Sequence, residues 1–288
     1  MAIVYHGAKD HGKPTVLKHF GTLQAAIYRM VTMFSGQNGL TKGSDGSFIY
    51  MPYSSVEPRS MNSTQILDEF CALMKSVSIM EYQFDESKAL ALNDVWMDDP
   101  IGSGGMAIFD RNAISAEQLA NIWPIFEPFR GPIFPDDLCL KYSRKEIKSL
   151  IAGFKKDKIG AAEYRERRVR ARYVGEDFHK TKYQEAVWVH LTLELRKWSL
   201  KHKYSSFSYK NTQEGTGENS YVALSSDVVS RTGNVLMFDE ALYRRTIAPI
   251  ITTVMKSQLS QFNNDMIMID KVIWAGKNPT SFWNKTRC

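Results

Sequence analysis

The apolar residues of this chain come in short runs separated by polar turns, and no run approaches the roughly 20 residues that a membrane-spanning helix requires. Residues 3–5 read as a short buried strand, and residues 47–53 (SFIYMPY) as a second one. Elsewhere the spacing is helical: Thr22 is the expected N-cap of a helix over 23–34, and an amphipathic pattern runs over 185–202. Further strands are predicted over 207–209, 220–224, 234–238 and 266–274, and further helices from residues 63 and 240. These patterns predict a folded chain that mixes helices and strands and does not span a membrane.

The composition is that of an ordinary folded protein. Of the 288 residues, 43% are hydrophobic and 24% are charged, which argues against global disorder. The three cysteines, Cys71, Cys139 and Cys288, are odd in number and far apart, which favours a reducing compartment over a disulfide framework. The six histidines show no pair at metal-ligand spacing, so no metal is expected.

The charge is concentrated in one segment. Residues 141–173 hold twelve Lys or Arg and four Asp or Glu, a net charge of +8, whereas the whole chain carries +6. The rest of the chain therefore sums to −2, so a nearly neutral body carries one basic element. The commoner meaning of such a run is a solvated helix face, but its cations also attract polyanions. The candidate contacts for a nucleic acid or other acceptor are Arg165, Arg167, Arg168, Arg170 and Arg172.

The basic segment belongs to a middle region that is harder to assign. It contains a glycine run at residues 102–105, which lacks the lysine and preceding strand of a phosphate-binding loop and reads as a hinge. We interpret residues 81–184 as an inserted, mainly helical basic lobe. Residues 1–80 and 185–288 then form the core, so the chain is a single split domain.

Three motifs stand out, and each is weak alone. Residues 5–7 (YHG) end the first strand, residues 19–29 (HFGTLQAAIYR) form a strand, turn and helix, and residues 209–224 (YKNTQEGTGENSYVAL) form two strands around a polar turn. In this order they resemble the signatures of the ADP-ribosyltransferase superfamily, in particular its bacterial toxin-like branch. The resemblance covers about residues 1–75 and 186–240, and the middle lobe has no counterpart in it.

The resemblance implies an α+β fold, with an ADP-ribosyltransferase-like core of two packed, mostly antiparallel sheets and a cleft that binds NAD⁺ as co-substrate. In His-Tyr-Glu members a first-strand histidine contacts the nicotinamide ribose, the next glycine binds the carboxamide through its backbone, and a helical tyrosine stacks on the nicotinamide ring. By motif position these roles fall on His6, Gly7 and Tyr28. By default such a histidine is structural and such a tyrosine belongs to the core, so only the combination of motifs supports these roles. The remaining candidate NAD⁺ contacts are His19, Thr22, Asn211 and Ser220.

The acidic position departs from the simplest pattern of the superfamily. In the polymerase-type branch a glutamate directly precedes the tyrosine of the late strand, where this chain has Ser220. Two candidate catalytic residues, Glu214 and Glu218, lie on the preceding turn. Glu214 is preferred because it occupies the acidic place of the toxin-like EG signature. A carboxylate there would face the positive charge that develops as the nicotinamide–ribose bond breaks.

The expected function is a mono-ADP-ribosyltransferase toxin, a glycosyltransferase that moves ADP-ribose from NAD⁺ to a macromolecular acceptor. The basic segment, with Tyr164 and Tyr173 interleaved, favours RNA or single-stranded DNA as that acceptor. Because the first strand begins at residue 3 with no leader before it, the sequence favours a bacterial cytoplasmic toxin with a partner antitoxin or a phage-defence role. An injected effector, acting in host cytoplasm, is less favoured. The alternatives are a protein-modifying effector and, because of Ser220, a non-catalytic nucleic-acid-binding or interaction module on a degenerate transferase fold.

Overall fold

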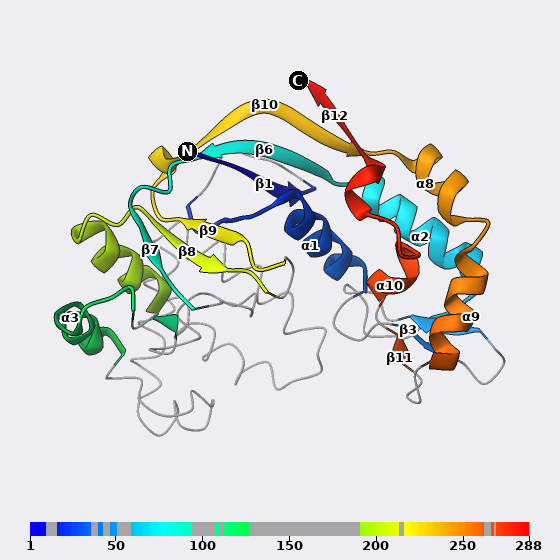
Figure 1. Cartoon of the computed structure of the whole chain (residues 1–288), viewed down its shortest axis with the longest axis horizontal. Helices are drawn as coiled ribbons and strands as arrows, with labels where there is room; N and C mark the ends of the chain where they lie inside the picture. The colour runs from blue at the N-terminus through cyan, green and yellow to red at the C-terminus, as the bar shows by residue number, and fades with distance from the viewer. Residues whose placement is uncertain are drawn as a thin grey trace, which may run out of the picture.

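The computed structural model describes residues 1–9, 16–35, 40–42, 47–50, 59–93, 108–109, 112–126, 191–212, 216–261, 266–267 and 269–287. Within these ranges the chain forms three four-stranded sheets, with helices packed mainly towards the two ends of the long axis (Figure 1). The predicted α+β class is therefore confirmed. In the described sheets the neighbouring strands are antiparallel, except for a single parallel pair.

Sheet A brings together strands from distant parts of the sequence. Its order is β1 (Ala2–Ala8), β6 (Ser78–Phe84), β10 (Val229–Phe238) and β12 (Trp283–Arg287). Figure 1 shows β6 and β10 arching over the top of the molecule. The register of β10 against β6 shifts between residues 231 and 235, and Gly233 in this bulge has a φ of 85°. Glycine adopts that left-handed conformation without steric cost, which explains its place in the bulge.

Sheet B packs against sheet A and is joined to it by one backbone bridge. Its order is β2 (His19–Phe20), β9 (Asn219–Ala223), β8 (Ser206–Lys210) and β7 (Ala89–Ala91), with β7 and β8 parallel. The bridge pairs Tyr5 of β1 with Gly21, whose amides donate to each other's carbonyl oxygens over 2.8 and 3.1 Å. The core between the sheets is apolar and contains Val4, Phe20, Met80, Tyr82, Phe84, Tyr221 and Val235.

Sheet C and most helices lie at one end of the molecule. Sheet C has the order β11 (Met266–Ile267), β3 (Leu40–Lys42), β4 (Phe48–Tyr50) and β5 (Arg59–Met61). Figure 1 shows these strands beneath the helices on the right, whereas α3 lies on the left with the helix that is described over 191–201. The helical elements are α1 (Leu23–Ser35), α2 (Ser63–Lys75), α3 (Ala116–Phe126), α8 (Glu240–Ile247), α9 (Ile251–Gln261), α10 (Ile269–Ile273), η3 (Ser226–Val228) and η4 (Pro279–Phe282).

An aromatic cluster forms the core between sheet A and the helices. Phe70 of α2 is fully buried, and its ring lies within 5.2–5.9 Å of the rings of Phe34, Phe238, Tyr243 and Trp274. The buried Tyr243 hydroxyl donates a hydrogen bond of 2.5 Å to the carbonyl of residue 273, so its polar atom is satisfied. This cluster fixes α1, α2 and α10 against sheet A.

Two helix starts follow from their capping residues. The hydroxyl of Thr22 accepts a hydrogen bond of 3.2 Å from the amide of Ala25, which confirms the predicted N-cap of α1. The predicted helix from residue 63 is also confirmed. Its cap is a reciprocal pair, in which the side-chain oxygen of Asn62 accepts from the backbone amide of Gln65 and the side-chain oxygen of Gln65 accepts from the backbone amide of Asn62.

The predicted strand over 266–274 is wrong for most of its length. Only Met266–Ile267 form β11, and Ile269–Ile273 form the short helix α10. Val272, Ile273 and Trp274 are buried in the aromatic cluster. A short apolar run is compatible with a buried strand or a buried helix, and here tertiary packing selects the helix.

The described residues of the proposed lobe 81–184 are few. Residues 81–84 complete β6, residues 89–91 form β7, and α3 packs near the helix of residues 191–201. The remaining ranges of this lobe lie outside the described residues.

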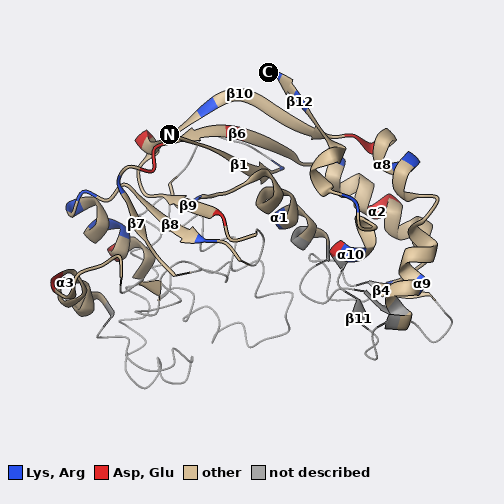
Figure 2. Ribbon diagram, viewed as in Figure 1, with Lys and Arg blue, Asp and Glu red and all other residues tan. Residues whose placement is uncertain are grey.

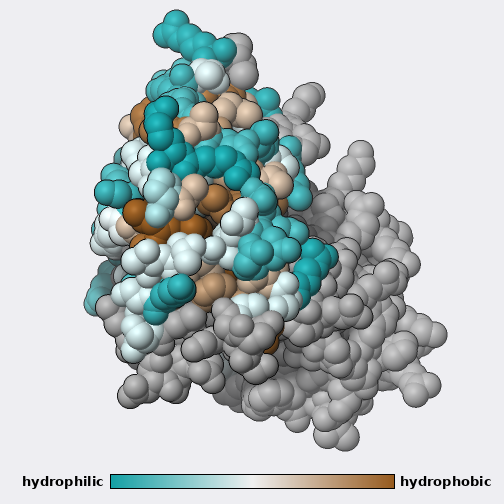
Figure 3. Space-filling view, turned by 90° about the vertical axis from the view of Figure 1, so that its right-hand side faces the viewer, coloured by the Kyte–Doolittle hydropathy of each residue, from teal (hydrophilic) through white to brown (hydrophobic). Residues whose placement is uncertain are grey.

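The described surface carries few large apolar residues. Those that are exposed are Met1, Ile3, Leu200 and Met237. Figure 3 shows the face at the α8 and α9 end, where hydrophobic residues are interspersed among hydrophilic ones. Among the described helices, none has the length and apolarity needed to cross a bilayer.

Candidate functional site

The three motif segments meet where β1, β2 and β9 lie side by side. The ring nitrogen Nδ1 of His6 lies 2.9 Å from the carbonyl oxygen of His19. Phe20 packs against the His6 ring, with their centroids 5.7 Å apart. Residue 20 in turn pairs with Tyr221 across the β2–β9 ladder. Segments separated by about 200 residues in the sequence thus contribute to one junction.

The contact between His6 and His19 fixes how the His6 ring is protonated. A backbone carbonyl can only accept a hydrogen bond, so Nδ1 of His6 must carry the proton that it shares with the His19 oxygen. In the neutral ring, Nε2 is then the acceptor. The backbone of β2 therefore orients the His6 imidazole and sets its tautomer.

Ser220 occupies the centre of this junction and packs against a glycine. A Cβ atom placed on Gly21 would lie 2.8 Å from the Ser220 Oγ and 3.2 Å from the Ala25 Cβ. The Ser220 Oγ also accepts a hydrogen bond of 3.2 Å from the buried side-chain amide of Asn211. The absence of a side chain at residue 21 lets β2 approach β9 closely, and Asn211 fixes Ser220 there.

Tyr209 is a member of the junction that sequence reasoning did not select. Its hydroxyl lies 3.0 Å from Nδ1 of His19, and the tyrosine is only 6% exposed. This partly buried hydroxyl–imidazole bond fixes the ring of His19 much as the carbonyl of His19 fixes the ring of His6. The signal was in the sequence, since Tyr209 opens the third motif, two residues before Asn211.

Gly7, Thr22 and Tyr28 lie around α1. A Cβ atom on Gly7 would meet the side chain of Met30 at 3.0 Å, so β1 and α1 also approach closely. Thr22 caps α1. Tyr28 is half-buried on this helix, and burial, followed by the negative charge of Asp270 on α10, raises the pKa of its phenol. Contact of Tyr28 with a nicotinamide ring remains a prediction.

The candidate acids lie on the turn between β8 and β9. Glu218 is exposed, and its carboxylate accepts a hydrogen bond of 2.8 Å from the amide of Thr216 and another from the Thr216 hydroxyl. These hydrogen bonds hold the pKa of Glu218 below its ordinary value, so the group is ionised at neutral pH. Its carboxylate is engaged by its own turn. Glu214 and the five arginines from residue 165 to residue 172 lie outside the described residues.

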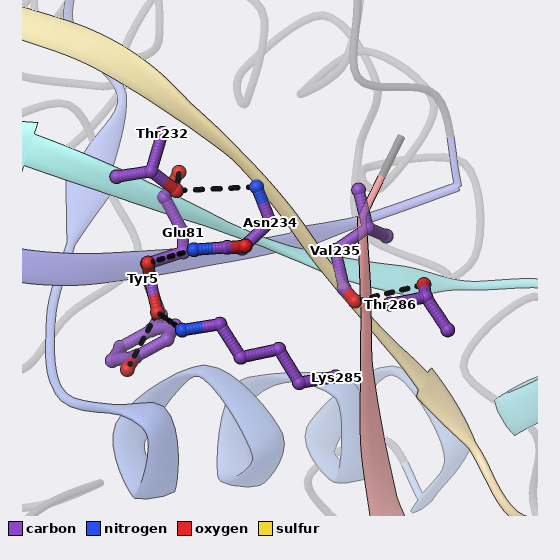
Figure 4. A network of polar contacts seen from close by, with 7 residues as sticks. All are labelled: Tyr5, Glu81, Thr232, Asn234, Val235, Lys285 and Thr286. Carbon is purple, nitrogen blue, oxygen red and sulfur yellow. Dashed lines mark hydrogen bonds and ion pairs between the residues drawn. The ribbon is translucent and has the colours of Figure 1, made fainter.

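A buried carboxylate, Glu81 of β6, lies beside the junction and was also missed. It is only 6% exposed, and Lys285 Nζ, Asn234 Nδ2 and the Tyr5 hydroxyl donate to it over 2.7, 2.6 and 3.3 Å (Figure 4). The bulge of β10 brings Thr232 into the same network, where its hydroxyl donates to the Glu81 carbonyl. The sequence signal was a single acidic residue inside the otherwise mostly apolar strand of residues 78–84.

The pKa of Glu81 reflects two opposing effects. Burial raises it, but hydrogen bonds from Lys285, Asn234 and Thr232, together with the charge of Lys285, outweigh burial and lower the pKa below its ordinary value. A carboxyl whose pKa is lowered by folding stabilises the fold above the unfolded-state pKa of about 4.3, and this stabilisation is lost as the pH falls through the folded-state pKa. Glu81 lies on β6 and binds residues from β1, β10 and β12. The network therefore links all four strands of sheet A around one buried negative charge.

We expect the Lys285→Met substitution to lower the free energy of unfolding at neutral pH by about 1.5 kcal/mol, because it removes a hydrogen bond to a charged group and Lys285 is half-exposed. The difference from the unsubstituted protein should shrink as the pH falls below the unfolded-state carboxyl pKa of about 4.3 and through the lowered folded-state pKa of Glu81. Urea unfolding between pH 7 and pH 3 measures both effects. Lys277→Met, at an exposed lysine, is the control and should show no such dependence. An equal loss for Lys285→Met at both pH values would contradict this role.

No protein-family model matches the chain, and neither a curated protein nor a solved structure matches it. Among the described residues, no group of His, Cys, Asp or Glu side chains is arranged to hold a metal ion. The functional evidence is therefore the geometry of the junction.

Proposed function

We propose that the protein is a mono-ADP-ribosyltransferase that uses NAD⁺ and modifies RNA or single-stranded DNA. The observation that carries the proposal is the junction itself, where the backbone of His19 in β2 orients the His6 ring, and β2 in turn pairs with β9, the strand that follows the acidic turn. The third motif that resembles the superfamily is about 190 residues from the first two in sequence, and the fold brings it to them. A coincidental match of short motifs would not require this proximity.

The polar groups of the junction suit a ligand rich in hydroxyl groups. Nε2 of the neutral His6 ring can accept a hydrogen bond from a ribose hydroxyl, and the resemblance assigns the backbone of Gly7 to the nicotinamide carboxamide. In the reaction, the bond between C1′ of the ribose and the nicotinamide nitrogen breaks, and its electron pair leaves on nicotinamide. The acceptor oxygen or nitrogen bonds to C1′, and its proton passes to a carboxylate base. A carboxylate near C1′ would also stabilise the positive charge of the transition state.

The two candidate acids are expected to differ in importance. Because the Glu218 carboxylate is held by Thr216, we expect Glu218→Gln to change the rate of nicotinamide release only severalfold. Glu214→Gln should lower it by about 100-fold or more, as the loss of a preorganised charge does in other active sites. Nicotinamide release is measured by chromatography, with Glu117→Gln on the surface of α3 as the matched control. Nearly unchanged rates in both substituted proteins would remove the carboxylates of this turn from the mechanism.

The acceptor is tested by labelling. We expect label from the adenylate part of NAD⁺ to enter material of a total cell lysate that nuclease digests and protease does not. Label confined to protein would instead support a protein-modifying transferase. A bacterial cytoplasmic toxin, countered by an antitoxin or acting in phage defence, is the setting that we propose for this activity.

One observation favours a second, non-catalytic candidate. Ser220 stands where the polymerase-type branch has a glutamate, and it is fixed in place by Asn211 and by contact with residue 21. A degenerate transferase fold that only binds nucleic acid would share this feature. Failure of the purified protein to release nicotinamide, with and without nucleic acid, would favour this candidate.

A further inference from the structure

A stack of aromatic rings lies where the helix of residues 191–201 ends and the chain enters β8. The rings of Trp198 and His202 stack with centroids 4.2 Å apart and planes 25° apart, and those of Trp198 and Tyr204 lie 6.2 Å and 19° apart. Trp198 is buried, whereas His202 and Tyr204 are half-exposed. Two of the three nearly parallel rings, those of His202 and Tyr204, therefore belong to partly solvent-accessible residues.

The half-exposed rings are fixed by local hydrogen bonds. Nδ1 of His202 donates to the carbonyl of Trp198 over 2.8 Å, and Gln118 of α3 donates to the Tyr204 hydroxyl over 2.7 Å. Lys203, between the two rings, has a φ of 67°, a left-handed conformation that is costly for a residue with a side chain. This turn ends the helix and places the rings of His202 and Tyr204, on either side of Lys203 in the sequence, against Trp198. Because the rings are already ordered, a ligand that stacks on them loses little additional entropy.

Three lysines lie near the stack along the chain or through a backbone hydrogen bond. The exposed lysines are Lys88, Lys201 and Lys203. The amide of Ser205 donates to the carbonyl of residue 88, so the residue just before β7 lies near the stack. Figure 2 shows Lys and Arg gathered at this end, on the helix of residues 191–201 and on the segment that leads into β7. Among the described residues, no carboxylate forms an ion pair with any of these three lysines. Asp85 interacts with the charge of Lys88 at longer range, but no direct ion pair within the described residues neutralises these lysines.

We propose that this surface, the Lys88–Lys201–His202–Lys203–Tyr204 corner, binds a single strand of nucleic acid. Ordered aromatic faces beside cations are the combination that binds unpaired bases and phosphates together. An acidic protein surface would use the lysines but not the rings, and a duplex hides its base faces by stacking them within the helix.

The corner also has a suitable position relative to the proposed active site. Tyr204 lies just before β8, and Tyr209, near the end of β8, contacts His19. The corner and the junction are therefore five positions apart along this strand. At about 3.3 Å per strand residue this is roughly 17 Å, a span that a few nucleotides can cover. Delivery of the strand to the junction rests on the proposed function, whereas binding at the corner does not.

The test is anisotropy of a fluorescent single-stranded RNA of about ten nucleotides, titrated with the full chain in the absence of NAD⁺. We expect Lys88→Gln/Lys201→Gln/Lys203→Gln to weaken binding at least tenfold near 0.1 M salt. The slope of log affinity against log salt should fall by about 2, since each neutralised phosphate contact contributes about 0.7 for a single strand. The control, Arg245→Gln/Lys256→Gln/Lys277→Gln, removes the same charge from exposed positions elsewhere and should bind like the unsubstituted protein.

Substitutions of Tyr204 test the stacking separately. Tyr204→Phe keeps the ring and should keep the affinity, whereas Tyr204→Leu should weaken binding about tenfold, as loss of one base–aromatic contact does. Unchanged affinity and salt slope in the triple-lysine protein would overturn the proposal. Equal affinity for duplex and single-stranded RNA would also overturn it. If polyglutamate displaced the RNA equally well from the unsubstituted and the Tyr204→Leu protein, the corner would instead bind an acidic protein partner. Normal oligonucleotide binding without nicotinamide release would refute the proposed transferase function alone.

Discussion

His6→Ala is expected to lower the rate of nicotinamide release from NAD⁺ by about 100-fold or more, a loss typical of removing one preorganised polar contact at a reacting centre. The His6 ring is anchored by the hydrogen bond from Nδ1 to the carbonyl of His19, so its second nitrogen is presented in a fixed direction. Alanine removes both nitrogens. The measurement is chromatographic detection of nicotinamide at saturating NAD⁺.

Two further substitutions at this position separate anchoring from chemistry. Asparagine places an amide N–H near the position of Nδ1, so His6→Asn should keep the bond to His19 and the thermal stability, but not the activity. Glutamine reaches the position of Nε2 and should retain more activity than alanine. Full activity in both His6→Ala and His6→Asn would exclude His6 from the reaction.

Gly21→Ala is expected to destabilise the fold by about 1–3 kcal/mol, the usual cost of overpacking a tight interior contact. The new Cβ would lie 2.8 Å from the Ser220 Oγ, an oxygen that cannot move away without breaking its hydrogen bond from Asn211. Because β2 has only two residues in its ladder with β9, the shift should also separate His19 from Tyr209. Thermal unfolding and nicotinamide release should therefore fall together.

A double substitution identifies the clash as the cause. Ser220→Ala removes the obstructing oxygen, so Gly21→Ala/Ser220→Ala should be less destabilised than the sum of the two single substitutions, with a coupling of about 1 kcal/mol. Gly7→Ala is the matched comparison in the neighbouring strand. There the three atoms nearest to the new Cβ all belong to the side chain of Met30, which can shift more easily than the hydrogen-bonded Ser220, so the loss should be smaller. Additive effects of the Gly21 and Ser220 substitutions would contradict this explanation.

Local features of the sequence were sufficient to predict several elements. Thr22 and the pair Asn62–Gln65 satisfy amide groups within three residues, so their capping roles do not depend on the rest of the fold. The segment at 266–274 could not be assigned in this way. Its helix is selected by burial of Trp274 against Phe70 and Phe282, residues that are distant in the sequence.

The site was predictable only in part for the same reason. The order of three motifs indicated that His6, His19 and Ser220 belong together, and the junction unites them. The roles of Tyr209 and Glu81 depend on strand register and on the β10 bulge, which decide which side chains meet across the sheets. No single-sequence pattern specifies these pairings.

The Glu81 network also bears on how the chain is made. Tyr5 and Lys285 donate to the same carboxylate, although they are 76 and 204 residues away from it along the chain. During synthesis on the ribosome, β1 and β6 emerge long before β12, so Glu81 lacks its lysine until residue 285 has been made. Sheet A can therefore reach its final stability only after β12 leaves the exit tunnel, and contacts of such long range slow folding. A nascent chain of this protein would therefore keep sheet A incomplete for longer than a chain whose sheets form from local contacts.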